Sequence, residues 1–129
     1  MIKDGVIVDT SVLIDFLKGI AKAATEVTKL LQANRVVTTG IIIAELIQGI
    51  GRADEEDRIA ELLSGVSVLE VSTPLWIEAG RLSSSLRRKG ITLPLTDTAI
   101  AVLALENNLT LYTFDRHFAQ VPNLKIYKV

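Results

Sequence analysis

Short apolar runs alternate along this chain with segments in which apolar residues recur at helical spacing. The apolar runs, rich in β-branched residues, predict buried strands over residues 6–8, 36–38, 66–71, 109–113 and 124–127. The segments with helical spacing predict helices over residues 11–17, 23–34, 41–50, 54–64, 74–89 and 99–106. Strands that alternate with helices indicate an α/β fold in which a mainly parallel sheet is covered by helices.

Residues that favour helix ends mark several of these boundaries. Thr10 or Ser11 is expected to cap the first helix, and Thr96 or Asp97 the last, because side-chain oxygens accept hydrogen bonds from free backbone N–H groups. Gly51 is expected to close the third helix. These boundaries leave only short turns between the strands and the helices that follow them.

The length of 129 residues, without repeats or flexible linkers, predicts a single domain over residues 1–129. Hydrophobic residues make up 49% of the chain and charged residues 22%, which is enough apolar surface for a folded core. The chain has no Cys, which excludes disulfides, thiolate zinc sites, Fe–S clusters and cysteine nucleophiles. With no signal-peptide pattern and no apolar run of ~18 residues, we expect a cytoplasmic location.

The charges of the chain nearly balance. Lys and Arg number 14 and Asp and Glu number 15, which gives a formal net charge of −1. A protein that held nucleic acid by bulk charge would be strongly basic, so that kind of binding is excluded. Any contact with nucleic acid would need a local basic patch or a bound metal.

Several acidic residues follow strands or interrupt apolar segments. Asp9 comes directly after the first predicted strand, and Asp115 follows the fourth. Asp97 lies at the N-terminus of the last helix, and Glu45 lies inside the apolar segment Ile41–Ile47. Ligands of open α/β sheets bind beyond the carboxyl ends of the strands, so we expect a site there.

Each of these acids also has an ordinary structural interpretation. Asp9 and Asp97 are suited to cap helices, where the helix dipole stabilises a carboxylate. Asp115 fits a turn, and Glu45 fits the one polar stripe of its helix, beside Gln48. Spacing alone therefore leaves open whether the four acids meet in the folded chain.

Carboxylates that converged at one end of a sheet would repel one another. Such a cluster persists only if a cation neutralises it or if some of its members bind a proton. Because the chain has one His and no Cys, an all-oxygen site indicates Mg²⁺ or Mn²⁺ rather than zinc.

Four segments of the chain resemble the signature motifs of the PIN-domain nucleases. They are Ile7–Ile14, Ala44–Leu46, Leu95–Ala101 and Leu111–Phe118. Each motif is of moderate specificity by itself, but all four occur in the order of the family, so the resemblance covers essentially the whole chain. It implies a PIN-like three-layer fold, with a mainly parallel central sheet flanked by helices.

Among these nucleases, a chain of this length resembles the VapC-type toxins of type II toxin–antitoxin modules. That resemblance implies a ribonuclease in which Asp9, Glu45, Asp97 and Asp115 hold Mg²⁺ or Mn²⁺. It further implies RNA as the substrate, a homodimer, and a cognate antitoxin protein that threads a segment into the active-site groove. The fourth acidic position varies in the family, and this chain keeps it as Asp115.

The implied chemistry is hydrolysis of RNA phosphodiester bonds by a metal-activated water. Asp9 and Asp97 are assigned as the primary metal ligands because both are expected on short rigid turns. Glu45 and Asp115 would orient water or hold a second ion. The hydroxyls of residues 10–11 would brace the Asp9 carboxylate or simply cap the helix.

Basic and aromatic side chains offer weaker candidates. The cluster at 87–89 and Arg116 are the best local candidates for contacts with an RNA backbone, although cations also suit the last turn of a helix. His117 fits a contact with phosphate or an ordinary turn. Trp76 is expected in the core or in an interface rather than as a platform for a nucleobase.

Other classes of protein fit the acids less well. A receiver domain would need a phosphoacceptor Asp after the third strand, where the chain has Ser72 and Thr73 instead. A haloacid-dehalogenase-like phosphatase would need an Asp two residues after Asp9, where the chain has Ser11. The remaining alternative is a non-catalytic PIN-like binding module whose acids serve the fold or a partner.

Overall fold

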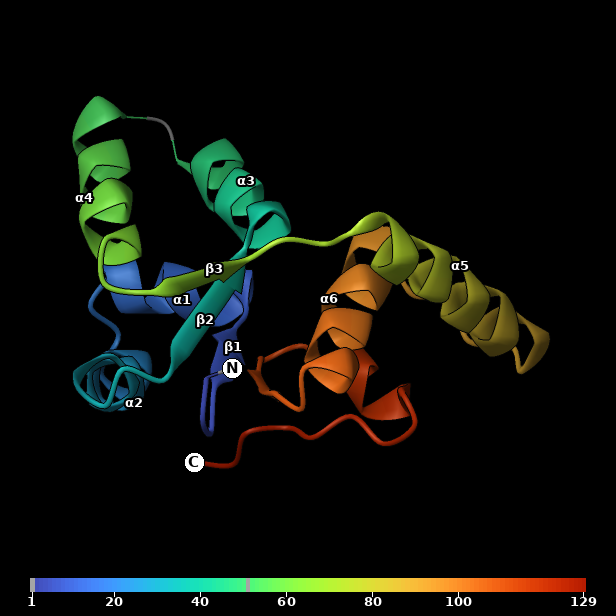
Figure 1. Cartoon of the computed structure of the whole chain (residues 1–129). Coiled ribbons are helices and arrows are strands. Elements are labelled where there is room, and N and C mark those ends of the chain that lie inside the picture. The colour runs from blue at the N-terminus through green and yellow to red at the C-terminus, as the bar shows by residue number, and fades with distance from the viewer. Residues whose placement is uncertain (1, 51) are drawn as a thin grey trace.

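The chain, seen here as a computed structural model that describes residues 2–50 and 52–129, folds around a parallel sheet (Figure 1). Its strands are β1 (Val6–Val8), β2 (Val36–Thr39), β3 (Ser67–Leu69) and β4 (Thr110–Tyr112). They lie in the order β3-β2-β1-β4, and every pair of neighbours is parallel. The carboxyl ends of these strands therefore lie at the same edge of the sheet.

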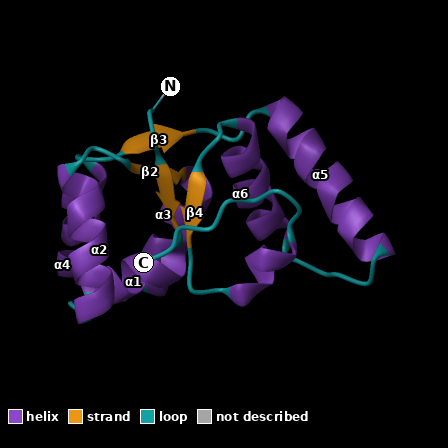
Figure 2. Ribbon diagram, turned by 90° about the horizontal axis from the view of Figure 1, so that it is seen from below, coloured by secondary structure: helices purple, strands orange, loops and turns teal. Residues whose placement is uncertain are grey.

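Helices cover both faces of the sheet. They are α1 (Thr10–Leu17), α2 (Ala21–Gln32), α3 (Gly40–Gly49), α4 (Ala53–Leu63), α5 (Thr73–Arg88), α6 (Leu95–Glu106) and a short 3₁₀ helix, η1 (Arg116–Gln120). In Figure 2, α1, α2 and α4 lie on one side of the sheet and α5 and α6 on the other. The predicted α/β fold with a parallel sheet between helical layers is confirmed. No helix in the described ranges is long and apolar enough to cross a membrane.

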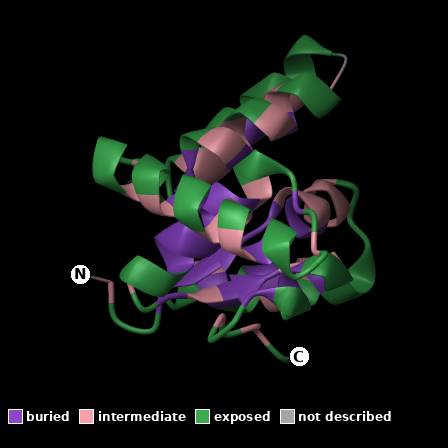
Figure 3. Ribbon diagram, turned by 90° about the vertical axis from the view of Figure 1, so that its right-hand side faces the viewer, coloured by how far each residue is buried: buried purple, intermediate pink, exposed green. Residues whose placement is uncertain are grey.

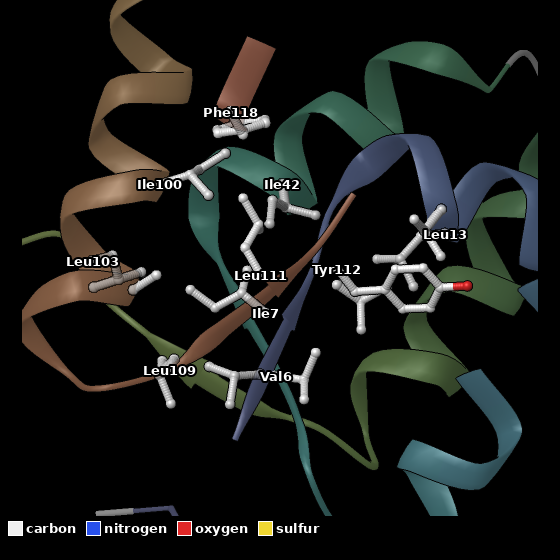
Figure 4. Close-up of a cluster of buried hydrophobic side chains, with 14 of the residues drawn as sticks. Val6, Ile7, Leu13, Ile42, Ile100, Leu103, Leu109, Leu111, Tyr112 and Phe118 are labelled. Atoms are coloured by element: carbon white, nitrogen blue, oxygen red, sulfur yellow. The ribbon is translucent and has the colours of Figure 1, made fainter. Parts of the chain in front are cut away.

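The core lies where the sheet meets the inner helices. Every residue of β1 is fully buried, because this strand runs between β2 and β4 and is covered on both faces. Helix α6 contributes the unbroken buried segment 98–104. In Figure 4, Ile100 and Leu103 of α6 lie toward Ile7 and Leu111 of the sheet, and Figure 3 shows exposed residues on the outer faces of the helices. Burial of this apolar surface is the main contribution to stability.

Two of the predicted strands differ from the structure. The strand predicted over 66–71 is shorter, because β3 is the edge of the sheet and pairs with β2 alone, and Val68 is exposed. The strand predicted over 124–127 is wrong. This segment meets β4 through a single isolated bridge between Leu111 and Ile126, so no ladder forms.

The six predicted helices begin one to four residues earlier than the sequence pattern predicts, and in α1 and α6 this changes which residue is the cap. Asp9 occupies the N-cap position of α1, so residues 10–11, expected as caps, are instead the first helical residues. Pro94 occupies the N-cap position of α6, where its fixed φ and missing N–H suit the residue that precedes a helix. Its carbonyl accepts a hydrogen bond from the Thr98 N–H at 3.0 Å. Residues 96–97 therefore lie inside the first turn rather than at the cap.

The outer helix α5 presents part of its apolar stripe to solvent. Ala79 and Leu86 are buried, but Trp76 keeps 40% of its surface exposed. Trp76 is therefore not part of the core, because α5 packs on α6 at the periphery rather than directly on the sheet. Gly51, expected to end α3, lies outside the described residues.

Gly5, directly before β1, leaves no room for a side chain. A Cβ there would lie 2.7 Å from Leu109 Cδ2 and 3.2 Å from Val37 Cγ2. Gly5→Ala should lower the free energy of unfolding by about 1–3 kcal/mol, because these buried side chains must shift. Gly80→Ala is the matched control, since an added Cβ in the middle of α5 meets nothing within 4 Å. It should raise stability by about 0.5–1 kcal/mol. Urea unfolding measures both variants, and equal stabilities would contradict close packing at Gly5.

Candidate functional site

Asp9 stands at the carboxyl end of β1, where the strand turns into α1. The residue is only 7% exposed. Although Asp9 is the N-cap residue, its carboxylate makes no capping hydrogen bond. Instead, Oδ2 accepts hydrogen bonds from Ser11 Oγ at 3.3 Å and from Thr113 Oγ1 at 2.8 Å. The capping interpretation therefore does not describe this side chain, which is a buried carboxylate held by two hydroxyls.

The same two hydroxyls tie the loop after β4 to the start of α1. Ser11 Oγ accepts a hydrogen bond from the Phe114 N–H at 3.2 Å, and Thr113 Oγ1 accepts one from the Asp115 N–H at 3.0 Å. The Asp9 carboxylate, the two hydroxyls and the two N–H groups form one continuous hydrogen-bonded unit, called here the Asp9 network. It fixes the backbone of the loop relative to the carboxylate.

Thr113 is the member of this network that sequence reasoning missed. Its hydroxyl makes the shorter of the two contacts with Asp9, although the two residues are 104 positions apart in the chain. The one signal available in the sequence is its place two residues before Asp115, in the segment that follows a predicted strand. A threonine in a loop has many other roles, so that signal was not sufficient.

Glu45 reaches from α3 toward the start of α1. Its Oε1 accepts a hydrogen bond from Thr10 Oγ1 at 2.9 Å, and the residue is half-buried. The Thr10 hydroxyl thus braces Glu45, so the expectation that residues 10 and 11 both hold Asp9 is correct for Ser11 alone. Gln48, on the same predicted polar stripe, is exposed. Glu45 is therefore not simply a solvent-facing member of that stripe.

Asp97 lies half-buried in the first turn of α6. Burial, followed by the charges of Asp9, Glu45 and Asp115, raises the pKa of Asp97 from 3.8 to about 6, while His117 lowers it. Charge effects of this kind require groups that lie near one another. Asp9, Glu45 and Asp115 therefore lie within electrostatic range of Asp97.

The pKa of Asp9 is raised as well. Burial is the largest cause, because it disfavours the charged form, and the charge of Asp115 adds to it. The Thr113 hydroxyl, the Thr10 N–H and the Ser11 hydroxyl oppose the shift by hydrogen bonding to the ionised carboxylate. Two carboxyls with raised pKa at one edge of the sheet form a site that favours a counter-charge, either a proton or a cation.

Asp115 combines a structural contact with an electrostatic one. Its Oδ1 accepts a hydrogen bond from the His117 N–H at 2.9 Å, which caps η1, and lies 3.0 Å from His117 Nδ1. Through Oδ1, Asp115 therefore acts as the turn residue that one interpretation of the sequence predicts. Its charge nevertheless raises the pKa of both Asp9 and Asp97. His117 occupies the turn itself and is mostly exposed.

The basic side chains considered as RNA contacts remain at the surface. Residues 87–89 and Arg116 are exposed, and Arg88 donates a hydrogen bond to Ser84 Oγ at 3.0 Å within α5. None of them is among the charges that set the pKa of Asp97. Their placement neither joins them to the acids nor gives them another contact across the fold.

The acids suit a divalent cation by their chemistry. Across the described part of the chain, no Lys or Arg forms an ion pair with Asp9, Glu45 or Asp97, so no protein cation compensates their charge. Within residues 2–50 and 52–129, no group of three or more His, Asp or Glu side chains is placed to hold a metal ion. Mg²⁺ is commonly held by one or two carboxylates while water completes its coordination. By their chemistry, one or two of these carboxylates could hold Mg²⁺ or Mn²⁺, with water as the remaining ligands.

The chain is similar to known proteins over most of its length, including the segments that carry the four acids. The profile of the PIN domain family matches residues 6–124, a range that includes all four acids. The chain is similar to Ribonuclease VapC2 of Rickettsia felis, with 27% identity over 96 residues, or 70% of this chain and 72% of that protein.

The fold is also similar to solved structures over nearly its full length. DNA-bound VapBC from Salmonella typhimurium superposes with a TM-score of 0.84 at 26% identity, covering 98% of each chain. VapBC-1 from nontypeable Haemophilus influenzae superposes with a TM-score of 0.77 at 29% identity, covering 95% of this chain and 96% of that one.

The raised pKa of Asp97 makes the stability of the metal-free protein depend on pH. Between 3.8 and about 6, the folded state holds a proton on Asp97 that the unfolded chain releases. The stabilisation that this proton gives the folded state is therefore fully present below pH 3.8. The free energy of unfolding should fall as pH rises from 3.8 to about 6. Asp97→Asn should flatten this fall, whereas Asp57→Asn, at an exposed acid of α4, should leave it unchanged. Urea unfolding in EDTA from about pH 4 to 7 measures the profiles. Parallel profiles for wild type and Asp97→Asn would contradict the charge cluster.

Proposed function

Because the chain belongs to the PIN domain family, we propose that it is a ribonuclease, built as a single domain over residues 1–129, that hydrolyses phosphodiester bonds of RNA. The observation that carries this proposal is the buried Asp9 carboxylate, gathered with the charges of Glu45, Asp97 and Asp115 at one edge of the sheet. Acids that only supported the fold would be expected to have cationic partners. In the described ranges, Asp9, Glu45 and Asp97 have no Lys or Arg partner.

We assign Asp9 and Asp97 as the residues that hold Mg²⁺ or Mn²⁺. The Asp9 network fixes the first carboxylate, and the first turn of α6 fixes the second, so both offer oxygens from rigid positions. A bound divalent cation would lower the pKa of water and neutralise charge on the attacked phosphate. It would also offset the repulsion that raises the pKa of Asp97.

Glu45 and Asp115 are assigned to water, or to a second ion. The hydrogen bond from Thr10 occupies Oε1 of Glu45, so water would be oriented through Oε2. Asp115 uses Oδ1 to cap η1, which assigns the same role to its Oδ2. Each carboxylate can orient a water molecule at its second oxygen and accept a proton there.

The relatives support a regulated nuclease. The relative from Rickettsia felis is named a ribonuclease, and both solved structures carry the name VapBC. We propose that this chain is the toxin of a toxin–antitoxin module, forms a homodimer in the cytoplasm, and is inhibited by a cognate antitoxin. The uncompensated charge of Asp9 and Asp97 is the feature that a basic side chain of the antitoxin would neutralise.

The purified protein should cleave RNA only with Mg²⁺ or Mn²⁺. The products should carry 5′ phosphates and 3′ hydroxyls, because water rather than the ribose 2′-hydroxyl attacks phosphorus and the bond to the 3′ oxygen breaks. Asp97→Asn should abolish cleavage without loss of fold, since the amide keeps the shape of the side chain and removes its charge. Gel analysis with and without EDTA, with circular dichroism as the folding control, tests both points. Full cleavage in excess EDTA or 2′,3′-cyclic phosphate ends would contradict the mechanism. No cleavage by the wild type would favour the non-catalytic binding module.

Thr113→Val removes the hydroxyl that donates to Asp9 while it keeps the branched shape. We expect a roughly 10- to 100-fold loss of metal affinity or cleavage rate, the usual effect when a group that orients a ligand is removed. Thr113→Ser keeps the hydroxyl and should retain most of the activity. Cleavage rates over a Mg²⁺ titration measure the effect. Equal losses in the two variants would show that the methyl group matters and the hydroxyl does not.

A further inference from the structure

Phe114 is an exposed aromatic residue within the acidic site. It keeps 42% of its surface open to solvent, although its neighbours Thr113 and Asp115 are both engaged in the site. A single exposed apolar side chain is ordinary on a protein surface. This one, however, has its backbone N–H bonded to Ser11 Oγ, which itself donates to the Asp9 carboxylate.

The Phe114 ring has a fixed support. Its backbone N–H donates to Ser11 Oγ at 3.2 Å, so the base of the side chain belongs to the Asp9 network. The ring packs edge-to-face against Tyr112, with centroids 5.8 Å apart and planes at 88°. Tyr112 is only 2% exposed and lies in the core cluster of Figure 4. Its ring also packs on that of Tyr127, with centroids 4.9 Å apart. Phe114 therefore offers a preorganised surface, with little side-chain entropy left to lose on binding.

The charge of the chain does not supply affinity for RNA. The net charge is −1, and the clustered acids repel a phosphate backbone until a cation neutralises them. Stacking of a base on an aromatic ring does not depend on net charge. Alanine substitution of such rings typically weakens binding by roughly 5- to 150-fold per base. An aromatic ring beside the acids can therefore supply affinity that electrostatics does not.

We propose that Phe114 is a stacking platform that binds a nucleobase next to the scissile phosphate of single-stranded RNA, an assignment that rests on the proposed nuclease function. Phe114 follows Thr113 by one residue, ~3.8 Å between Cα atoms, and Thr113 bonds directly to Asp9. The ring and the Asp9 carboxylate are therefore placed to engage neighbouring nucleotides of one strand.

This platform determines the substrate class. A base that stacks on Phe114 must leave its own helix, so the RNA must be single-stranded or splayed at the cleavage position. Every base has a π face, so stacking by itself gives only a modest sequence preference. We expect cleavage of loops and unpaired segments, and poor cleavage of duplex RNA of the same sequence.

Phe114→Leu and Phe114→Trp separate stacking from apolar bulk. With a short unpaired RNA that the wild type cleaves, Phe114→Leu should raise KM by roughly 5- to 150-fold with a smaller change in kcat. Phe114→Trp keeps a π face and should restore KM to near the wild-type value. Trp76→Leu, at an aromatic residue that is 40% exposed on α5, is the matched control and should leave KM unchanged. Melting temperatures of all variants verify that they are folded.

An abasic nucleotide tests the contact itself. Once the cleavage position is mapped, the same RNA is made with an abasic ribose on one or the other side of it. One of the two abasic substrates should raise KM for the wild type about as much as Phe114→Leu does. On that substrate the wild type and Phe114→Leu should no longer differ. If the abasic substrate and Phe114→Leu each raise KM independently, so that their fold-changes multiply when they are combined, the proposal is overturned.

The outcomes distinguish this inference from the function on which it rests. If the wild type cleaves the RNA and Phe114→Leu cleaves it equally well, the platform is wrong and the nuclease stands. If the wild type binds the RNA in a Phe114-dependent way without cleaving it, the platform stands and the nuclease is wrong. If the wild type neither binds nor cleaves RNA, both are wrong. If Phe114→Leu weakens only inhibition by the antitoxin, Phe114 contacts protein and the proposal is overturned.

Discussion

The buried carboxylate of Asp9 is the constraint on which the rest of the site depends. It is 7% exposed and has no Lys or Arg partner in the described ranges, so its charge relies on the hydroxyls of Ser11 and Thr113 and on any counter-ion the site admits. The same hydroxyls accept hydrogen bonds from the N–H groups of residues 114–115. One carboxylate thus fixes the loop after β4 and adds to the raised pKa of Asp97.

The parallel sheet places the acids after β1 and β4 near each other, and its buried core offsets their repulsion. Because β1 lies between β2 and β4 and all of them run in one direction, the acid after β1 and the acid after β4 emerge at the same edge. Like charges held together destabilise the metal-free fold, which is common at functional sites. Here the buried residues of β1 and the segment 98–104 of α6 offset that repulsion with apolar burial. Strain at the site is therefore compatible with a stable chain.

Under the proposed nuclease function, a chain with a net charge of −1 would bind RNA through short-range contacts. In that proposal the acids would hold a cation and the exposed Phe114 ring would bind a base. Contacts of this kind depend less on salt than a broad surface of Lys and Arg, because fewer phosphate charges are neutralised by the protein. The exposed cluster at 87–89 stands outside this arrangement, since none of its charges acts on Asp97.

The sequence by itself determined the local features of this protein. The β-branched run at 6–8 predicts β1 to the residue, and Glu45 stands out because a carboxylate interrupts an apolar helix. The segment 124–127 has a similar strand pattern but meets β4 at one residue, because pairing requires register along a whole edge. Only the tertiary structure decided that Thr113 holds Asp9 across 104 residues of chain. That contact exists because β4 lies beside β1, and strand order is set by the packing of the entire chain rather than by local propensity.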